Sequence, residues 1–253
     1  MSLKNKSYPL LSIIMPAYNE EKTISKVIND ILSLNILNGS FEIIVIESNS
    51  SDSTRQILRN NYSNNERIHI YYQDKPLGKG YAVREGFLYA KGNIILIQDA
   101  DDEYDVNDYT KLLQPLLNSD AVFVLGSRHS PNKRMRVFDD QPLRAAILNV
   151  GHIFFTYSIN FLFKVKLYDP FTMFKVFKKS CIKDMNFRCN RFDFDHELVI
   201  KMILAGFTPT EIPVSYISRS FNDGKKIRFI YDPISWLLII LKLWFKHKIL
   251  KIK

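Results

Sequence analysis

The chain has 253 residues, which suits one large domain or two small ones. Hydrophobic residues make up 46% and charged residues 24%, with only 9 glycines and 10 prolines, so the composition excludes a disordered or fibrous chain. The formal net charge is +9, and residues 225–253 hold eight Lys or Arg against the single acid Asp232. A basic tail on a near-neutral body predicts contact with an anionic surface at one end, and it disfavours nucleic-acid binding.

The expected compartment follows from the cysteines and the first residues. Cys181 and Cys189 are too few for a disulfide framework and fit a reducing compartment. Residues 1–8 are polar and lack the apolar run of a signal peptide. These features predict a cytoplasmic protein whose tail faces a membrane.

Short apolar runs alternate with helical patterns through the first half of the chain. The runs expected to form buried strands are 10–15, 41–46, 68–72, 94–97 and 121–125. Apolar residues recur at helical spacing from Ile24 to Ile31, after a possible Asn19 cap, and again from Val106 to Leu116. This alternation predicts an α/β fold with a mainly parallel, twisted sheet and helices on both faces. Ligands of such sheets bind beyond the carboxyl ends of the strands.

Polar loops follow the first three expected strands. Pro16-Ala17-Tyr18-Asn19-Glu20-Glu21 follows the first, residues 47–54 follow the second, and Pro76-Leu77-Gly78-Lys79-Gly80 follows the third. Glycines beside Lys79 at a helix start can bind a phosphate through backbone N–H groups, although ordinary turns and helix caps would also explain these loops. The pattern is neither a Walker loop nor GxGxxG, which disfavours a nucleotide hydrolase and a dinucleotide dehydrogenase.

A cluster of acids follows the fourth expected strand. The segment Gln98-Asp99-Ala100-Asp101-Asp102-Glu103 places four carboxylates within five positions, where they repel one another unless a cation or solvent shields them. Asp99 and Asp101 flank one residue at a strand end, so both can face one hard divalent ion. Such an ion would stabilise the charge of a leaving diphosphate.

Two apolar segments occupy the second half. Residues 145–163 contain no Asp, Glu, Lys or Arg and are long enough to span a bilayer, but five polar residues interrupt them. We expect a buried or membrane-facing helix there. A second helix is expected from Asp232, with Trp236, Trp244 and flanking lysines, and this pattern is typical of a helix in the membrane interface; a core-packing helix is the alternative. The predicted division is a catalytic domain at 1–231 and an amphipathic tail at 232–253.

Several of these segments occur together, in the same order, in a known enzyme family. PAYNEEKTI, VIESNSSDST, PLGKGYAVREG, IQDADDE, VLGSRH, DPFTMFKVF, FDFDHEL and SRSFNDGKKI resemble the motifs of family 2 inverting glycosyltransferases of the GT-A fold. Their spacing is most similar to the dolichyl-phosphate-mannose-synthase-like branch. The resemblance covers roughly residues 9–230, and it implies a nucleotide-sugar donor and a divalent metal cofactor, Mn²⁺ or Mg²⁺.

The resemblance implies a role for each matching position. Residues that would bind the nucleotide sugar are Pro16, Ala17, Tyr18, Glu20, Glu47, Lys79, Asp99, Ala100 and Asp101. Glu47 stands where Asp is commoner. Asp99 and Asp101 would hold the metal together with Glu103, which stands where the branch commonly has Gln. The segment 169–173 departs from the threonine- and glycine-containing form of the branch, on the side where the acceptor binds.

Displacement at the anomeric carbon of a sugar requires an acceptor oxygen that loses its proton as it attacks. Asp193, Asp195 and Glu197 precede an apolar helical run, and Glu197 matches the last acid of the family motif. Asp195 or Glu197 is therefore the expected general base. Acids are also common at helix starts because of the helix dipole, and a lipid phosphate acceptor, already anionic, would need a base less.

Five cationic residues are candidates for binding phosphate groups. They are Arg128, Arg144, Arg219, Lys225 and Lys226. Arg128 follows the fifth expected strand, Arg144 begins the uncharged helix, and the last three would close over the diphosphate as a lid. The histidines at 129, 152 and 196 show no metal-ligand spacing and are interpreted as structural.

The sequence thus predicts a metal-dependent inverting glycosyltransferase on the cytoplasmic face of a membrane. Its acceptor would be a polyprenyl-phosphate-like lipid or a cell-envelope glycan. The alternative is a non-catalytic nucleotide-sugar-binding module or membrane adaptor on the same scaffold. The intact Asp99–Asp101 pair favours the enzyme.

Overall fold

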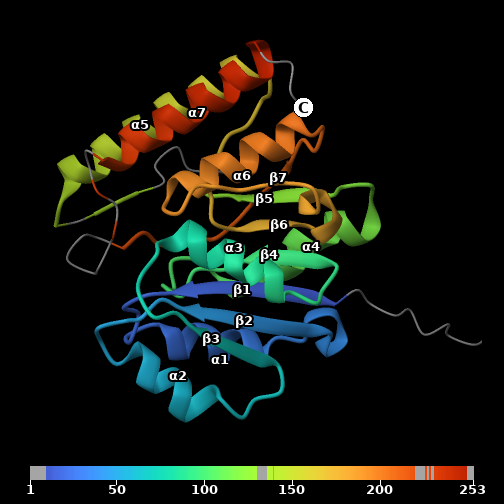
Figure 1. The fold of residues 1–253 in the computed structure, drawn as a ribbon, viewed down its shortest axis with the longest axis vertical. Coiled ribbons are helices and arrows are strands. Elements are labelled where there is room, and N and C mark those ends of the chain that lie inside the picture. The colour runs from blue at the N-terminus through green and yellow to red at the C-terminus, as the bar shows by residue number, and fades with distance from the viewer. Residues whose placement is uncertain are drawn as a thin grey trace, which may run out of the picture.

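The computed structural model describes residues 10–129, 136–138, 140–219, 226, 228 and 231–249. Seven strands in this part of the chain form one sheet in the order β3-β2-β1-β4-β6-β5-β7 (Figure 1). They are β1 Leu11–Ala17, β2 Phe41–Glu47, β3 Ile68–Tyr72, β4 Ile94–Ile97, β5 Phe123–Ser127, β6 Lys175–Lys178 and β7 Thr210–Pro213. Strand β6 pairs antiparallel with β4 and β5, whereas the other described pairs are parallel.

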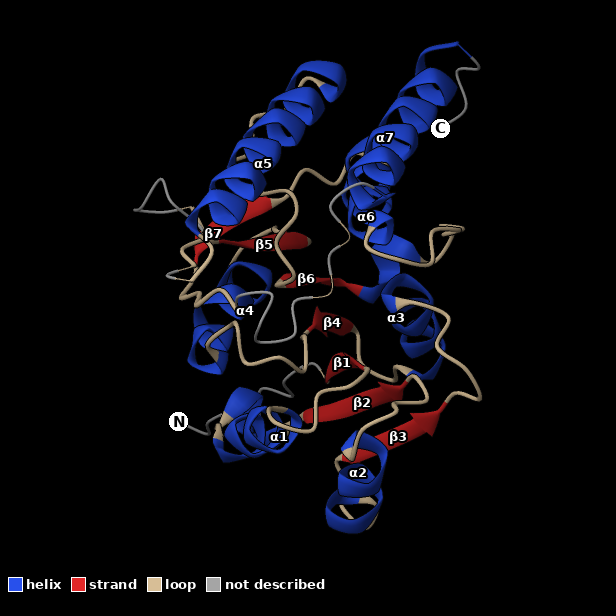
Figure 2. Ribbon diagram, turned by 90° about the vertical axis from the view of Figure 1, so that its left-hand side faces the viewer, coloured by secondary structure: helices blue, strands red, loops and turns tan. Residues whose placement is uncertain are grey.

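Helices cover both faces of the sheet, with α1 and α4 on one side and α3 and α6 on the other (Figure 2). The helices are α1 Ile24–Ser33, α2 Thr54–Tyr62, α3 Lys79–Tyr89, α4 Tyr109–Asn118, α5 Pro142–Phe163, α6 Asp193–Leu204 and α7 Tyr231–Ile249. Short 3₁₀ helices lie at Ile36–Gly39, Val106–Asp108 and Lys179–Ile182. The predicted α/β fold, with a mainly parallel sheet and a C-terminal helix, is confirmed.

The central strands are buried on both faces, which explains why they are apolar without alternation. All seven residues of β2 are buried, and β1 pairs with it in register from Leu11 opposite Phe41 to Ala17 opposite Glu47. This register places the carboxyl ends of β1 and β2 at the same edge of the sheet, where the polar loops leave.

Some details of the prediction were wrong. Strand β5 lies two residues further along than expected. Strands β6 and β7 were not predicted, because β6 carries a lysine at both ends and β7 has one large apolar residue, Ile212. Asn19 does not cap α1, since Thr23 precedes the helix and provides no side-chain cap. Asn19 instead adopts a left-handed conformation (φ 52°) and accepts a hydrogen bond from the Ser51 N–H, at 2.8 Å.

Helices α5, α6 and α7 enclose a second, smaller core at the end of the molecule opposite α2 (Figures 1 and 2). Its buried members are Phe155, Ile159, Ile200, Ile239, Ile240 and Leu243. The tail helix α7 therefore packs one face against α6 and α5, while other residues along it remain exposed.

The start of α3 lies against the loop that leads into α6. A Cβ at Gly78 would lie 2.4 Å from the backbone oxygen of Asn190, and a Cβ at Gly80 would lie 2.4 Å from the Cβ of Phe194. Gly78 also has a φ of +100°, a conformation that favours glycine. These two glycines permit the close approach of α3 and α6.

Candidate active site

A cavity of about 790 Å³ lies beyond the carboxyl ends of β1 and β4 and continues between α5, α6 and α7. We name its two parts by their walls. The charged arm is formed by Glu20, Lys79, Asp99, Asp101, Glu103, Arg219 and Lys226, and the aromatic arm by Phe155, Phe171, His196 and Trp236. Asp195 and Arg128 also line the cavity. The predicted location, beyond the strand ends, is therefore where the structure has a cavity.

Three carboxylates lie close together in the charged arm. Burial, followed by repulsion from Asp99 and Glu103, raises the pKa of Asp101 to about 7. Asp99 is paired with Lys79 at 2.6 Å, and Glu103 accepts hydrogen bonds from the Tyr216 hydroxyl at 2.6 Å and the Arg219 N–H at 3.0 Å. Carboxylate oxygens in such a cluster favour a cation, and they are the ligands that hard divalent ions prefer.

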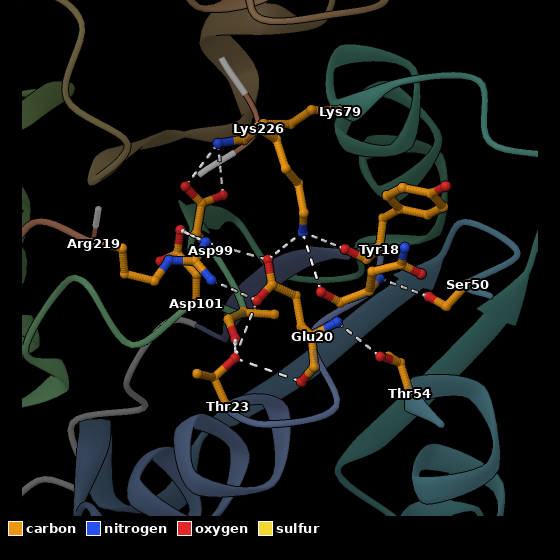
Figure 3. Close-up of polar contacts among 12 residues, drawn as sticks. Tyr18, Glu20, Thr23, Ser50, Thr54, Lys79, Asp99, Asp101, Arg219 and Lys226 are labelled. Carbon is orange, nitrogen blue, oxygen red and sulfur yellow. Dashed lines mark hydrogen bonds and ion pairs between the residues drawn. The ribbon is translucent and has the colours of Figure 1, made fainter. Parts of the chain in front are cut away.

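Two cations from the C-terminal part of the chain occupy this acidic cluster (Figure 3). The Arg219 guanidinium pairs with Asp101 at 2.7 Å and with Glu20 at 2.9 Å. Lys226 pairs with Glu20 at 2.5 Å and also donates to the backbone oxygen of Tyr18. The protein thus balances the acids with its own cations. Lys225, predicted beside them, lies outside the described residues.

The loops after β1, β2 and β4 are tied to one another. The Glu20 N–H donates to Thr54 Oγ1 at 2.8 Å, and Thr23 Oγ1 donates to the Ala100 oxygen at 2.7 Å (Figure 3). One residue in each loop has a left-handed backbone, namely Asn19, Asn49 and Asp102. Asn and Asp tolerate this conformation better than other side chains, so the polar composition of these loops also has a backbone cause.

Of the first-strand residues predicted to bind the nucleotide, Pro16, Ala17, Tyr18 and Glu20 line the cavity, as does Ala100. Glu47 is fully buried behind them. It pairs with Arg55 and accepts a hydrogen bond from the Ser50 N–H at 2.6 Å. It is not among the residues that line the cavity, so in this structure its carboxylate organises the loop after β2.

The two candidate bases point in different directions. Asp195 lines the cavity and pairs with the buried Lys175 at 2.9 Å. Glu197 accepts hydrogen bonds from the Arg188 and Cys189 N–H groups, both at 2.8 Å, and pairs with Lys201 at 2.7 Å. Burial alone would raise the pKa of Glu197, but these hydrogen bonds outweigh it and lower the pKa. Glu197 therefore holds the loop before α6.

The predicted arginines also differ in position. Arg128 forms a bidentate pair with the buried Asp169, with both N···O distances at 2.7 Å. Burial alone would raise the pKa of Asp169, but Arg128 outweighs it and holds the pKa well below its usual range. Arg144 lies on the exposed first turn of α5, with Nη1 3.1 Å from Gln141 Oε1, and is not among the residues that line the cavity. The structure therefore brings Arg128 and Arg219 to the cavity, but not Arg144.

The fold brings His129 and His152 within reach of Asp169, which their spacing in the sequence does not reveal. Ligand atoms of the three residues lie within 4.8 Å of one another. Both carboxylate oxygens of Asp169 are bonded to Arg128, however, and burial lowers the pKa of His152 to about 3. A cation there would have a single carboxylate, already held by a guanidinium. The charged arm offers three carboxylates and so fits a divalent ion better, although Arg219 and Lys79 pair with them.

Sequence reasoning missed five residues that line the cavity outside the strand-end loops. They are Arg136, Phe155, Phe171, Tyr216 and Trp236. Phe155 and Trp236 belong to α5 and α7, and the other three lie in connecting segments, so their positions depend on tertiary packing. The sequence predicts that Trp236 lies in a membrane-interface helix or, alternatively, in a core-packing helix, and in the structure it forms a wall of this cavity.

The chain is similar in sequence and in fold to several known proteins. The sequence profile of glycosyl transferase family 2 matches residues 12–185. Dolichyl-phosphate beta-glucosyltransferase ALG5A of Trichomonas vaginalis is 27% identical over 94% of this chain and 74% of that protein. UDP-N-acetylglucosamine–dolichyl-phosphate N-acetylglucosaminyltransferase of Methanococcus voltae is 27% identical over 92% of this chain and 96% of that protein.

A solved structure of similar fold is glucosyl-3-phosphoglycerate synthase from Mycobacterium tuberculosis, determined with Mn²⁺, UDP and phosphoglyceric acid. Its TM-score is 0.65 at 18% identity, and the match covers 93% of this chain and 78% of the synthase. The same synthase has been solved with Mg²⁺ and UDP. At this level of identity the likeness shows a common fold.

Proposed function

Because the chain belongs to glycosyl transferase family 2, and is thus a glycosyltransferase, we propose that it transfers a sugar from a nucleotide sugar to a lipid phosphate. The observation that carries the proposal is the joining of two unlike arms in one cavity. A charged arm suits a diphosphate and a cation, and an aromatic arm suits an apolar chain. The two dolichyl-phosphate transferases that resemble the whole chain support this acceptor class.

In this proposal the donor occupies the charged arm. The nucleotide lies against Pro16, Ala17 and Tyr18, and Lys79 contacts the diphosphate. Asp99, Asp101 and Glu103 would hold a divalent cation, Mn²⁺ or Mg²⁺, which would neutralise charge on the departing diphosphate. These three carboxylates suit a divalent ion, since the charged arm already needs the cation Arg219 to balance its acids.

The reaction is a displacement with inversion. An acceptor oxygen forms a bond to the anomeric carbon while the bond from that carbon to the diphosphate breaks, and the electron pair leaves with the nucleoside diphosphate. A lipid phosphate attacks through an oxygen that is already anionic, so Asp195 has no proton to remove and orients the sugar instead. A hydroxyl acceptor would pass its proton to Asp195, the acid that faces the cavity.

A transfer assay tests the proposal. Purified protein is incubated with UDP-, GDP- and dTDP-sugars, Mn²⁺ and farnesyl phosphate, and the glycosyl phosphate lipid is detected by mass spectrometry. We expect one nucleotide sugar to yield product only when metal is present. Transfer to a glycan hydroxyl, with none to farnesyl phosphate, would contradict the lipid acceptor.

We also propose that the protein lies on the cytoplasmic face of a membrane. Among the described helices, α5 alone is long and apolar enough to cross a bilayer, judged by length and composition. It exposes apolar side chains every three or four residues, at Leu143, Ile147, Val150, Phe154, Tyr157 and Phe161, while its other face packs against the domain. Helix α7 exposes further apolar residues and the three lysines Lys242, Lys246 and Lys248. Apolar and cationic groups together favour an anionic bilayer interface over a span.

Flotation with vesicles tests this placement. Each lysine near an anionic leaflet contributes about 1 kcal/mol, so the triple change K242E/K246E/K248E, which also adds three repelled charges, is expected to weaken binding to phosphatidylserine vesicles by more than about 100-fold. The matched control K22E/R59E/K183E alters the net charge equally at exposed positions far from α7 in the sequence. Equal loss in both variants would show a general charge effect and contradict the role of α7.

A further inference from the structure

His196 is a buried polar residue that neither the fold nor the proposed chemistry uses. It follows the candidate base Asp195 at the start of α6 and is only 3% exposed. Its ring is stacked between Phe171, at 4.2 Å between centroids, and Trp236, at 5.2 Å. Neither ring nitrogen makes a hydrogen bond of good geometry within the described residues, although the backbone carbonyl of Phe192, one turn earlier, is close enough to favour the protonated ring.

The neighbouring tryptophan also has a buried polar nitrogen, the indole Nε1 of Trp236, without a partner among the described residues. Phe155 meets both rings edge-on, at 6.1 Å from His196 and 5.5 Å from Trp236. Two adjacent, nearly parallel rings that line the cavity therefore carry polar nitrogens that are buried and have no partner among the described residues.

Packing does not explain this choice of residues. A phenylalanine at position 196 would keep the stack and would avoid the cost of burying two unsatisfied nitrogens. Burial also lowers the pKa of His196 to about 3, so the imidazole is neutral and carries one N–H donor. The indole adds a second donor. The missing partner is therefore a group that accepts hydrogen bonds.

We propose that His196 and Trp236 bind the phosphate end of the lipid acceptor, with His196 as the residue that positions it, while Phe155 and Phe171 contact the first part of its chain. This rests on the proposed function and names the subsite where the polar head and the apolar tail of the acceptor meet. The position beside Asp195 places the phosphate next to the reacting centre. The ligand recognised is a phosphate monoester attached directly to an apolar chain.

The tryptophans of this chain allow a direct test. Trp236 and Trp244 are the two in the sequence, so in a W244F background the fluorescence reports on the aromatic arm alone. The variant H196F, which keeps an aromatic ring in the stack, is compared with the parent. Farnesyl phosphate, farnesol and inorganic phosphate are titrated separately, and binding of UDP with Mn²⁺ is measured by calorimetry as the control.

We expect farnesyl phosphate to change the Trp236 emission and H196F to weaken its binding about tenfold, as the loss of a hydrogen bond to a charged group should. Farnesol binding should be equal in both proteins, and UDP binding unchanged. Equal affinity of parent and H196F for farnesyl phosphate would overturn the proposal. Equal weakening for farnesyl phosphate and farnesol would also overturn it, because His196 would then act only through the stack.

The outcomes separate this inference from the proposed function. Binding of farnesyl phosphate that depends on His196, without sugar transfer, would support the subsite and contradict the transfer reaction. Transfer to farnesyl phosphate with the same KM in parent and H196F would support the transfer reaction and overturn the subsite. A second variant, W236F, read by calorimetry with farnesyl phosphate, should also bind more weakly, and unchanged binding would count against the shared phosphate site.

Discussion

The charged arm and the aromatic arm of the cavity treat their polar atoms in opposite ways. In the charged arm the carboxylates of Glu20, Asp99 and Asp101 are all paired with Arg219, Lys226 or Lys79. In the aromatic arm, His196 and Trp236 hold buried nitrogens without partners among the described residues. A donor that enters the first arm must therefore exchange existing ion pairs, whereas an acceptor that enters the second arm adds hydrogen bonds.

The two arms should therefore respond differently to mutation. Substitutions in the charged arm change the competition between ligand cations and the protein's own cations. In the aromatic arm, replacement of His196 by phenylalanine removes an interaction that only the ligand completes, and it should leave the folded protein as stable as before or more stable.

The largest effect is expected for D101N, which removes a carboxylate at the proposed cation site. Loss of one preorganised electrostatic group at a reacting centre lowers rates about 10²- to 10³-fold. Transfer assays and calorimetry with UDP and Mn²⁺ should show loss of turnover and of metal-dependent binding. The control D102N alters the neighbouring acid, which pairs with Lys26 and has a left-handed backbone that Asn tolerates. Full turnover by D101N would contradict the cation site.

The variant R219Q tests whether the protein's own cations compete with a metal in the charged arm. Arg219 pairs with Asp101 and Glu20, so its removal should strengthen the binding of Mn²⁺ severalfold in the absence of nucleotide. Sugar transfer should nevertheless fall about 10²-fold, since a cation is lost beside the diphosphate. Electron paramagnetic resonance of free Mn²⁺ measures the first effect. Weaker binding of Mn²⁺ to R219Q would show that the arginine does not compete with the metal.

Two buried histidines that line the cavity should make folding stability depend on pH. Burial lowers the pKa of His152 and of His196 to about 3, while an unfolded histidine titrates near 6.5. Between these values the unfolded chain binds more protons than the folded one, so stability is full above about 6.5 and falls as the pH decreases towards 3. From pH 7 to pH 5 each histidine should cost about 2 kcal/mol of unfolding free energy.

Urea unfolding at both pH values tests this dependence. In H196F the difference between pH 7 and pH 5 should shrink by about 2 kcal/mol. In the control H247F, which alters an exposed histidine of α7, it should remain as in the parent. Equal pH dependence of the parent and H196F would show that His196 is charged in the folded protein.

The smallest effect on stability is expected for F161S. The Phe161 side chain is 83% exposed on α5, so its replacement should change the unfolding free energy by less than about 0.5 kcal/mol. Binding to vesicles should still weaken severalfold, because an apolar contact with the bilayer is lost. Unchanged flotation would indicate that this end of α5 does not touch the membrane.

The sheet and the charged arm were predictable because both depend on local sequence. Buried parallel strands are apolar throughout, and their ends carry the polar loops, so Asp99 and Asp101 could be placed at one edge of a sheet from position alone. Strand β6 could not, since its fully buried Lys175 resembles a surface residue until Asp195 is found beside it.

The candidate acids on α6 show what helix geometry adds. Asp195 and Glu197 are two residues apart, and successive helical residues turn by about 100°, so they lie on nearly opposite sides of the helix. Only one of them could face the cavity. Which one does so depends on how α6 packs against α3 and α7, and the same packing brings Trp236 to the aromatic arm. Such contacts between distant helices leave no periodic signal in the sequence.

The close approach of α3 to α6 has a consequence for substrate selection. Lys79 at the start of α3 lines the charged arm, where the donor is proposed to bind, and Asp195 at the start of α6 lines the same cavity. Gly80 allows the two helices to approach, since a Cβ at this position would lie 2.4 Å from the Cβ of Phe194 and 2.8 Å from the backbone oxygen of Cys189. Because a side chain larger than glycine does not fit at this contact, the distance between the starts of α3 and α6 is fixed by their backbones. In the proposed reaction this distance would limit the size of the sugar as much as its hydroxyl pattern does. A methyl group at position 80 would push the two helices apart and change which sugars fit.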